Sequence, residues 1–186
     1  DTGADPEGKP RYFAHVVSAI DGAILWKRDL TAYEAFDYRV YADDSDLAIP
    51  LDGPQGTAFS PHPTAVPDPD LAPEFVPSRL VTLSSLESVG VTDPWLPDGA
   101  EETVGNNVDA YLDLAAPNGF SPETDFRGRV SAPGSFDAEF DPLVDANIDR
   151  EQQNAAVTQL FYNINWLHDW YYAAGFTEAA GNAQAS

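Results

Sequence analysis

The sequence predicts an α+β fold in which short strands come first and one long, buried helix comes last. An apolar stretch interrupted by Asp21 and Gly22 is typical of a β-hairpin, and a helical repeat of apolar residues begins near Asn154. Ten of the sixteen prolines fall between residues 50 and 97, where they exclude a regular helix. A chain of 186 residues suffices for one domain, or for a small unit plus part of a larger one.

Residues Tyr12 to Leu25 carry the hairpin pattern. Two apolar runs, YFAHVVSAI and AILW, flank Asp21 and Gly22. This pair favours a tight two-residue turn, because both central positions of such a turn need positive φ. His15 lies inside the first run, and we interpret it as a packed or edge side chain rather than a metal ligand.

The proline-rich stretch at residues 50–97 has two interpretations, a flexible linker or an ordered strap over a core. Large apolar side chains, among them Trp95, favour the strap, because a disordered linker carries fewer of them. His62 lies between two prolines and is interpreted as an exposed loop residue.

The segment Thr103 to Asp113, TVGNNVDAYLD, predicts a tight turn that leads into a strand. Gly and Asn tolerate positive φ, and apolar residues then alternate with polar ones. Two roles are open for the side chains of Asn106 and Asn107. They coordinate a ligand or calcium, or they bond the turn backbone, and the second role is favoured.

The stretch from Asn154 to Gln184 predicts one long helix over its first two thirds. Apolar residues recur at the three-and-four spacing of one helical face: Val157, Leu160, Phe161, Ile164, Leu167, Tyr171 and Tyr172. Gly175 is placed to end the helix in a left-handed conformation. The opposite side is also apolar, since it holds Tyr162, Trp166 and Trp170. A helix apolar on most sides is expected to be buried, so this one requires a surrounding protein body.

Composition excludes several classes of partner. The net charge is -22 and only nine residues are Lys or Arg, so binding to nucleic acid or to an anionic membrane is not expected. The chain has no cysteine, which removes disulfides and thiolate metal ligands. No stretch approaches the length of a membrane span, and the first residues do not resemble a signal peptide.

The acidity has two interpretations, a strongly solvated surface or calcium sites built from clustered aspartates. Five carboxylates fall within thirteen residues, at Asp137, Glu139, Asp141, Asp145 and Asp149. Their order is not that of an EF-hand. Some of them also precede the helix, where negative charge favours the helix N-terminus. Asp137, Glu139, Asp141 and Asp145 are therefore candidate calcium ligands.

No complete catalytic set is visible. The three histidines do not form His-Glu-x-x-His, and the chain lacks a G-x-S-x-G elbow and a phosphate-binding glycine loop. We therefore assign no catalytic residue and no zinc ligand to this chain. His168 is interpreted either as a residue that orients an active site or, preferably, as a buried histidine paired with a carbonyl or a neighbouring carboxylate. Asp169 points elsewhere on the helix and is expected to pair or to cap.

The helical stretch resembles the motif of the fungalysin family of secreted zinc metallopeptidases, FY..N..HD..Y..GF.E.AGN.Q. The matching positions are Phe161, Tyr162, Asn165, His168, Asp169, Tyr172, Gly175, Phe176, Glu178, Ala180, Gly181, Asn182 and Gln184. Ala183 departs from the pattern, where an aromatic residue is usual. The segment with Asn106 and Asn107 is similar to the start of the family's catalytic domain, and YRVY at Tyr38 to Tyr41 is similar to the start of its mature enzyme.

This resemblance implies a secreted, extracellular zymogen. Residues 1–36 would be the end of a propeptide, with the junction near Phe36 to Tyr38, and residues 37–186 the mainly β N-terminal part of a thermolysin-like catalytic domain. The complete protein would be a zinc metalloendopeptidase that cleaves internal peptide bonds with a zinc-activated water. Its zinc ligands would lie outside this chain, which alone would be inactive. Its partners would be the rest of the catalytic domain, in the same or a cleaved chain, and a protein or peptide substrate.

A rival interpretation is a non-catalytic extracellular module, derived from the family, that uses an exposed aromatic helix as an interaction face. A third interpretation, a propeptide-type inhibitor, is weaker, because only about the first 36 residues resemble a propeptide.

Overall fold

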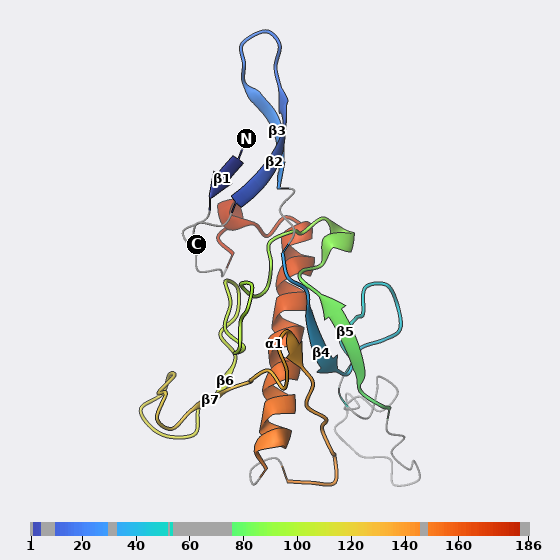
Figure 1. The fold of residues 1–186 in the computed structure, drawn as a ribbon, viewed down its shortest axis with the longest axis vertical. Helices are drawn as coiled ribbons and strands as arrows, with labels where there is room; N and C mark the ends of the chain where they lie inside the picture. Colours follow the sequence, from blue (N-terminus) through green and yellow to red (C-terminus); the bar gives the residue numbers. More distant parts are fainter. Residues whose placement is uncertain are drawn as a thin grey trace. The chain divides into compact units, whose positions relative to one another are not determined.

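The computed structural model describes residues 2–4, 10–29, 33–51, 53, 76–145 and 149–182. The chain divides into two compact units, Asp1–Tyr33 and Glu34–Ser186. Both contain short strands, and the second also contains one long helix (Figure 1). The α+β class is therefore confirmed. Much of the predicted strap, together with His62, lies outside the described residues.

The first unit is a three-stranded antiparallel sheet in the order β1-β2-β3. Its strands are β1 (Thr2–Ala4), β2 (Pro10–Val17) and β3 (Ile24–Asp29). β2 and β3 form the expected hairpin, but the prediction of a two-residue turn is wrong. The N–H of Ser18 donates to the carbonyl of Ala23 at 2.8 Å, which closes a longer loop. Gly22 has a φ of 75°, whereas Asp21 keeps negative φ because its carboxylate accepts a hydrogen bond from the Ala23 N–H at 3.1 Å.

The second unit is built around a three-stranded sheet in the order β5-β4-β8. Its strands are β4 (Phe36–Val40), β5 (Arg79–Leu83) and β8 (Ser135–Phe136). β4 pairs antiparallel with β5 and parallel with β8. Burial alternates along β4, because successive side chains of a strand point to opposite faces. The buried face of this sheet, formed from Phe36, Tyr38 and Val40, is one wall of the core.

Tyr38 lies at the centre of an aromatic core. Its ring is parallel to that of Phe136, with the centroids 5.6 Å apart. The rings of Trp95, Phe161 and Tyr162 lie 5.8, 6.2 and 6.0 Å from it. Offset aromatic pairs contribute about 0.5–1.5 kcal/mol each beyond the area they bury. Side chains from β4, β8, the strap and the helix therefore meet at one point.

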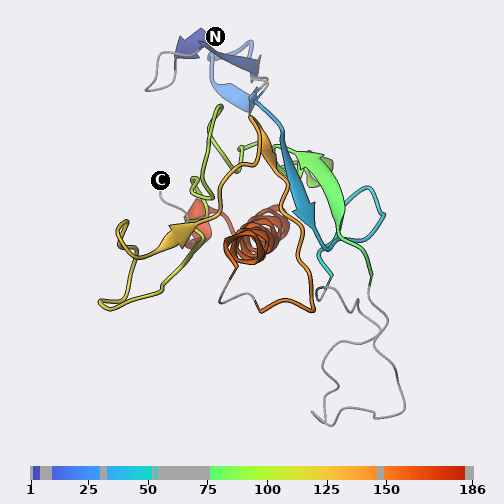
Figure 2. The same cartoon turned by 60° about the horizontal axis from the view of Figure 1, so that its bottom comes forward.

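The long helix α1 (Arg150–Ala173) packs on the buried face of the β5-β4-β8 sheet (Figure 2). It begins after Asp149, whose side chain accepts a hydrogen bond from the Glu151 N–H at 2.8 Å. It ends at Ala173, and Gly175, two residues further on, has the expected left-handed conformation with φ 104°. The N–H of Gly175 donates to the carbonyl of Tyr172, and that of Phe176 to the carbonyl of Tyr171, which is the pairing of a Schellman cap.

The expectation of a helix buried on most sides is wrong for one face of α1. Leu160, Ile164, Leu167 and Tyr171 are between 41% and 55% exposed, although they belong to the predicted core face. The buried face instead contains Tyr162 and Trp166, which were expected on the opposite side, together with Val157 and Phe161. The core face is thus rotated by roughly a third of a turn from the predicted one, at 3.6 residues per turn.

Two smaller features lie in the described part of the second unit. Strands β6 (Tyr111–Leu112) and β7 (Phe126–Arg127) form a two-stranded sheet, and short 3₁₀ helices lie at Glu87–Val89 (η2) and Glu178–Ala180 (η3). In the described part of the strap, Trp95 and Leu96 are buried, as an ordered strap requires. Among the described residues, no helix has the length and apolar character needed to cross a membrane.

Candidate functional site

The carboxylate of Asp169 on α1 makes three polar contacts. It is fully buried, and its Oδ2 accepts hydrogen bonds from the Leu86 N–H at 2.9 Å and from Trp95 Nε1 at 2.8 Å. Its Oδ1 lies 3.0 Å from Nδ1 of His168. A buried carboxylate is stable only when its oxygens are well bonded, and these partners supply that. Asp169 therefore fastens the helix to the strap, and the expectation that it pairs is confirmed.

His168 lies beside this anchor. Its side chain is 13% exposed, and its ring centroid is 5.9 Å from that of Tyr172. If Oδ1 of Asp169 accepts, Nδ1 of His168 carries the proton, which fixes the tautomer and orientation of the ring. The sequence predicts a carbonyl or a neighbouring carboxylate as the partner of a buried His168, and the carboxylate of Asp169 is such a neighbour. A role in orienting an active site stays a prediction.

The other motif residues near the end of α1 hold the chain locally. Asn165 is fully buried, and its Nδ2 donates to the Phe161 carbonyl at 2.9 Å, whereas its Oδ1 has no hydrogen-bond partner among the described residues. The hydroxyl of Tyr172 donates to Oε2 of Glu178 at 3.0 Å. Partial burial and this carboxylate raise the pKa of Tyr172. The N–H of Asn182 donates to the Thr177 carbonyl at 3.2 Å, which closes the turn after α1.

Asn106 and Asn107 lie at the tip of the predicted turn, which the backbone closes. Val104 pairs with Asp109, and the N–H of Gly105 donates to the Val108 carbonyl at 2.8 Å. Both polar atoms of the Asn107 side chain are buried without a hydrogen-bond partner in the described part of the chain. The favoured role for this side chain, bonding the turn backbone, is therefore not observed at Asn107.

Gly105 is required at this turn by a close backbone approach. A Cβ atom at this position would lie 1.8 Å from the carbonyl oxygen of Trp95. Any other residue would displace the strap that carries the Trp95 bond to Asp169. The turn motif and the helix motif thus fix the same buried tryptophan from two sides.

The four candidate calcium ligands are not gathered into one site. Asp137 pairs with Arg39 at 2.7 Å, and this bond raises the pKa of the arginine. Asp141 accepts a hydrogen bond from the Leu143 N–H at 2.9 Å, and Glu139 and Asp145 are exposed. Across residues 76–145 and the other described ranges, no three His, Cys, Asp or Glu side chains come together as a metal site.

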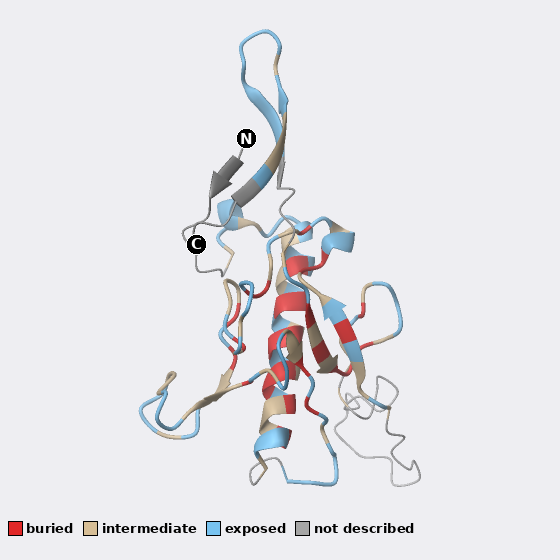
Figure 3. Ribbon diagram, in the orientation of Figure 1, coloured by how far each residue is buried: buried red, intermediate tan, exposed pale blue. Residues whose placement is uncertain are grey.

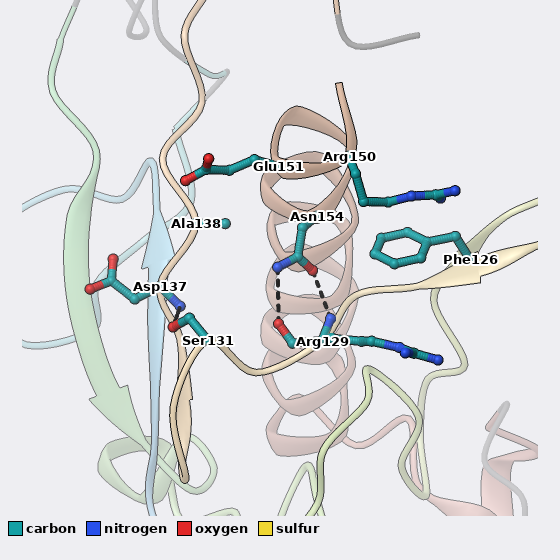
Figure 4. Close-up of a pocket in the computed structure, with 8 residues that line it drawn as sticks. All are labelled: Phe126, Arg129, Ser131, Asp137, Ala138, Arg150, Glu151 and Asn154. Carbon is teal, nitrogen blue, oxygen red and sulfur yellow. Dashed lines mark hydrogen bonds between the residues drawn. The ribbon is translucent and has the colours of Figure 1, made fainter. Parts of the chain in front are cut away.

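A shallow groove of about 530 Å³ lies at the start of α1 (Figure 4). Its lining residues are Phe126, Arg129, Ser131, Asp137, Ala138, Arg150, Glu151 and Asn154. Asn154 shapes it, because its Oδ1 accepts from the Arg129 N–H at 2.6 Å and its Nδ2 donates to the Arg129 carbonyl at 2.9 Å. Arg150 lies over the ring of Phe126 at 4.4 Å. The lining includes two arginines, one aspartate and one glutamate, and no histidine.

Sequence comparisons connect these elements to known proteins. The family described as Fungalysin metallopeptidase (M36) matches residues 81–186, which include the strap tryptophan and all of α1. Extracellular metalloproteinase 1 of Arthroderma gypseum is 28% identical over 190 residues, which cover 98% of this chain and 28% of that protein. Extracellular metalloproteinase 5 of the same organism is 38% identical over 97 residues, or 50% of this chain and 14% of that protein.

A third relative, Extracellular metalloproteinase 1 of Trichophyton equinum, is 37% identical over 95 residues, or 50% of this chain and 15% of that protein. No solved structure matches the chain. The chain thus spans 28% of the length of the Arthroderma gypseum relative that it matches almost throughout.

Proposed function

Because the chain belongs to the fungalysin family of metallopeptidases, we propose that it is the N-terminal part of a secreted zinc metalloendopeptidase. The complete enzyme would hydrolyse internal peptide bonds of proteins. The names of the relatives, extracellular metalloproteinases, support both the reaction class and the location. The second unit would form the first part of a thermolysin-like catalytic domain.

The residues of this chain do not fit a zinc site of their own. Such a site in a peptidase needs three protein ligands and a glutamate that acts on water. The sequence has three histidines, none of them in a His-Glu-x-x-His arrangement. We therefore place the zinc ligands on the remainder of the protein, and we expect this chain alone to be inactive.

The contribution of this part is to hold α1 in position. The observation that carries this proposal is the set of bonds at Asp169, which joins α1 to Leu86 and Trp95 within the region that matches the family. Those contacts fix the height and rotation of the helix against the strap. A helix so constrained is a rigid platform for the catalytic half of the enzyme.

The sequence predicts the propeptide junction near Phe36 to Tyr38, and we propose a slightly earlier position, between the unit boundary and Phe36. Phe36 begins β4 and is 1% exposed, so a mature chain that lacked it would lose part of the core. The boundary between the units falls after Tyr33. The hairpin of the first unit would then be the end of the propeptide. N-terminal sequencing of the secreted enzyme should find a terminus at residues 34–36, and a terminus beyond Tyr38 contradicts this placement.

Calcium remains a proposal for Asp137, Glu139, Asp141 and Asp145. Binding would need these side chains to come together and Asp137 to leave Arg39. Isothermal titration of chelator-treated protein should then show heat of binding that is lost in an Asp141→Asn, Asp145→Asn variant. Absence of heat in the parent protein removes the proposal.

Casein hydrolysis tests the function directly. The complete protein should degrade casein, lose this activity with a zinc chelator and regain it with added zinc, whereas the 186-residue chain should be inert. Intact mass of the purified material shows whether a second polypeptide accompanies the chain. An inert complete protein would favour the non-catalytic module instead.

A further inference from the structure

The first residue of the second unit is held by a reciprocal pair of hydrogen bonds, which we name the Glu34 clasp. The backbone N–H of Glu34 donates to Oδ1 of Asp98 at 2.9 Å. The backbone N–H of Gly99 donates to Oε2 of Glu34 at 2.7 Å. Two segments that lie 64 residues apart in the sequence thus each supply one backbone donor and one carboxylate.

A tight turn places the Asp98 carboxylate in the clasp. The N–H of Ala100 donates to the carbonyl of Pro97 at 3.1 Å, and Gly99, the third residue of the turn, has a φ of 72°. Positive φ at this position is typical of a type II turn, in which glycine is favoured. The turn closely follows Trp95, which is fully buried. The carboxylate therefore extends from a segment that is fixed in the core.

The backbone nitrogen of Glu34 lies where the two compact units meet in the sequence. The boundary falls between Tyr33 and Glu34. Residues 33–35 form no regular secondary structure, and Glu34 and Ala35 are exposed. β4 begins at Phe36 and alternates between buried and half-buried residues (Figure 3). Exposed chain outside regular structure is where proteolytic cleavage concentrates, so the Tyr33–Glu34 bond is better placed for hydrolysis than any bond within β4.

Hydrolysis of that bond changes the charge in the clasp. The bond between the Tyr33 carbonyl carbon and the Glu34 nitrogen breaks, and the added water completes a carboxylate on Tyr33 and an ammonium on Glu34. The ammonium forms on the nitrogen that already lies 2.9 Å from Oδ1 of Asp98. A neutral hydrogen bond thereby becomes a charge-assisted one, which is stronger. Among the described contacts of Glu34, the ionisable groups are Asp98 and its own carboxylate, whereas its neighbour Gly134 carries no charge.

We propose that the chain is cleaved between Tyr33 and Glu34, and that Asp98 then binds the α-ammonium of Glu34 as the new N-terminus. This inference rests on the proposed function, because it takes the first unit as the end of a propeptide. The ion pair exists only after cleavage, so it stabilises the mature form and not the precursor. Its contribution is modest, as for other exposed ion pairs.

Sequencing of the mature, secreted protein gives the first test, and the expected N-terminal residue is Glu34. A terminus at Ala35 or later removes the nitrogen that Asp98 holds. A terminus at Tyr33 or earlier leaves a neutral peptide N–H in the clasp. Either result overturns the proposal.

Titration of the new amine tests the pairing with Asp98. In the complete protein, the factor Xa recognition sequence Ile-Glu-Gly-Arg replaces Leu30 to Tyr33, so that cleavage leaves Glu34 as the terminus. Competitive amine labelling between pH 6 and 10, followed by mass spectrometry of the N-terminal peptide, measures the pKa of its α-amino group. This pKa should lie at least about 0.5 above the ordinary value of about 7.7–8.0, because a neighbouring carboxylate favours the charged form.

Two substitutions separate the ion pair from the overall charge of the chain. Asp98→Asn keeps an acceptor oxygen but removes the charge, so it should return the α-amino pKa to the ordinary value. Asp125→Asn removes one charge from a carboxylate that accepts from the N–H groups of Leu114 and Ser121, and it should leave the pKa raised. Equal values in the parent and in Asp98→Asn, or an equal fall in both variants, overturn the pairing.

A shifted cleavage site is the positional control. The same recognition sequence in place of Asp29 to Ala32 leaves Tyr33 as the terminus, with a neutral peptide N–H at Glu34. The ammonium then lies one residue away from the clasp, and its pKa should be ordinary with or without the charge of Asp98. A pKa raised equally at both termini overturns the assignment of the Glu34 nitrogen.

The two proposals can fail separately. A chelator-sensitive peptidase whose mature chain begins at Ala35 or Phe36 retains the proposed function and loses the role of Asp98. A complete protein that is inert towards casein but begins at Glu34, with an α-amino pKa that depends on Asp98, retains the ion pair and loses the peptidase.

Discussion

The inner and outer faces of α1 are built from similar apolar side chains, but only the inner face also carries polar groups bonded to other elements. Tyr162 donates its hydroxyl to the Ala48 carbonyl at 2.7 Å, and Trp166 and Asp169 make their own bonds to Leu47 and to Trp95. On the outer face, the exposed side chains of Leu160, Ile164 and Leu167 consist of hydrocarbon alone. Apolar character therefore makes both faces suitable for burial, and the polar bonds decide which one meets the sheet.

Neighbouring residues on the two faces give the largest expected contrast. Phe161 is 0% exposed and Leu160 is 45% exposed. Phe161→Ala should cost about 3–5 kcal/mol of unfolding free energy, because it leaves a cavity beside Tyr38. Leu160→Ala should cost under about 0.5 kcal/mol in the same chain. Urea denaturation measures both, and equal losses would contradict the assignment of the faces.

Removing the buried anchor should have the next largest effect. Asp169→Ala leaves the Leu86 N–H and Trp95 Nε1 without an acceptor. Each unsatisfied donor should cost about 1–3 kcal/mol of unfolding free energy. Part of this loss is offset, because the variant no longer buries a charged carboxylate. We expect a net loss of about 2–4 kcal/mol and a change in Trp95 fluorescence. Asp169→Asn keeps one acceptor oxygen and should lose less. A variant as stable as the parent would show that the anchor does not hold the inner face.

Two buried tyrosines distinguish a bonded hydroxyl from an unbonded one. The Tyr162 hydroxyl has its bond to Ala48, whereas the Tyr38 hydroxyl has no hydrogen-bond partner among the described residues. Tyr162→Phe should therefore cost about 0.5–1.5 kcal/mol, and Tyr38→Phe should be neutral or stabilise by about 1 kcal/mol. Differential scanning calorimetry of both variants shows whether the signs differ as expected.

Local patterns were sufficient to predict the hairpin, the helix and the glycine that ends it. Each depends on residues close in sequence, such as Gly175 next to the last turn of α1. The burial of the helix could not be predicted in the same way. Apolar residues surround α1 almost completely, so periodicity alone cannot choose the face that contacts Tyr38 and Phe136.

The contacts of the candidate site could not be predicted from local sequence patterns either. The sequence indicates that His168 and Asp169 belong to a motif, but their partners lie far away in the chain. Trp95 is 74 residues from Asp169, and no local signal joins them. The choice of Asp169, rather than His168, as the buried anchor follows from tertiary packing. The turn at Asp21 was mispredicted for a smaller reason, because its carboxylate bonds the backbone and stabilises a longer loop.

The pH dependence of stability provides the finest test of the inner face. Burial raises the pKa of both Tyr38 and Tyr162 far above the ordinary value of 10.0, and at Tyr162 the charge of Arg79 opposes part of this rise. Above pH 10 the unfolded chain releases these protons while the folded chain keeps them, so the folded state binds more protons and loses stability as pH rises. Each tyrosine should contribute up to about 1.4 kcal/mol per pH unit in this range. Urea midpoints at pH 8, 10 and 11 should fall less steeply in the double Tyr38→Phe, Tyr162→Phe variant than in the parent. Equal slopes for the double variant and the parent would show that the two inner hydroxyls are not shielded from water by the packing of α1 on its sheet.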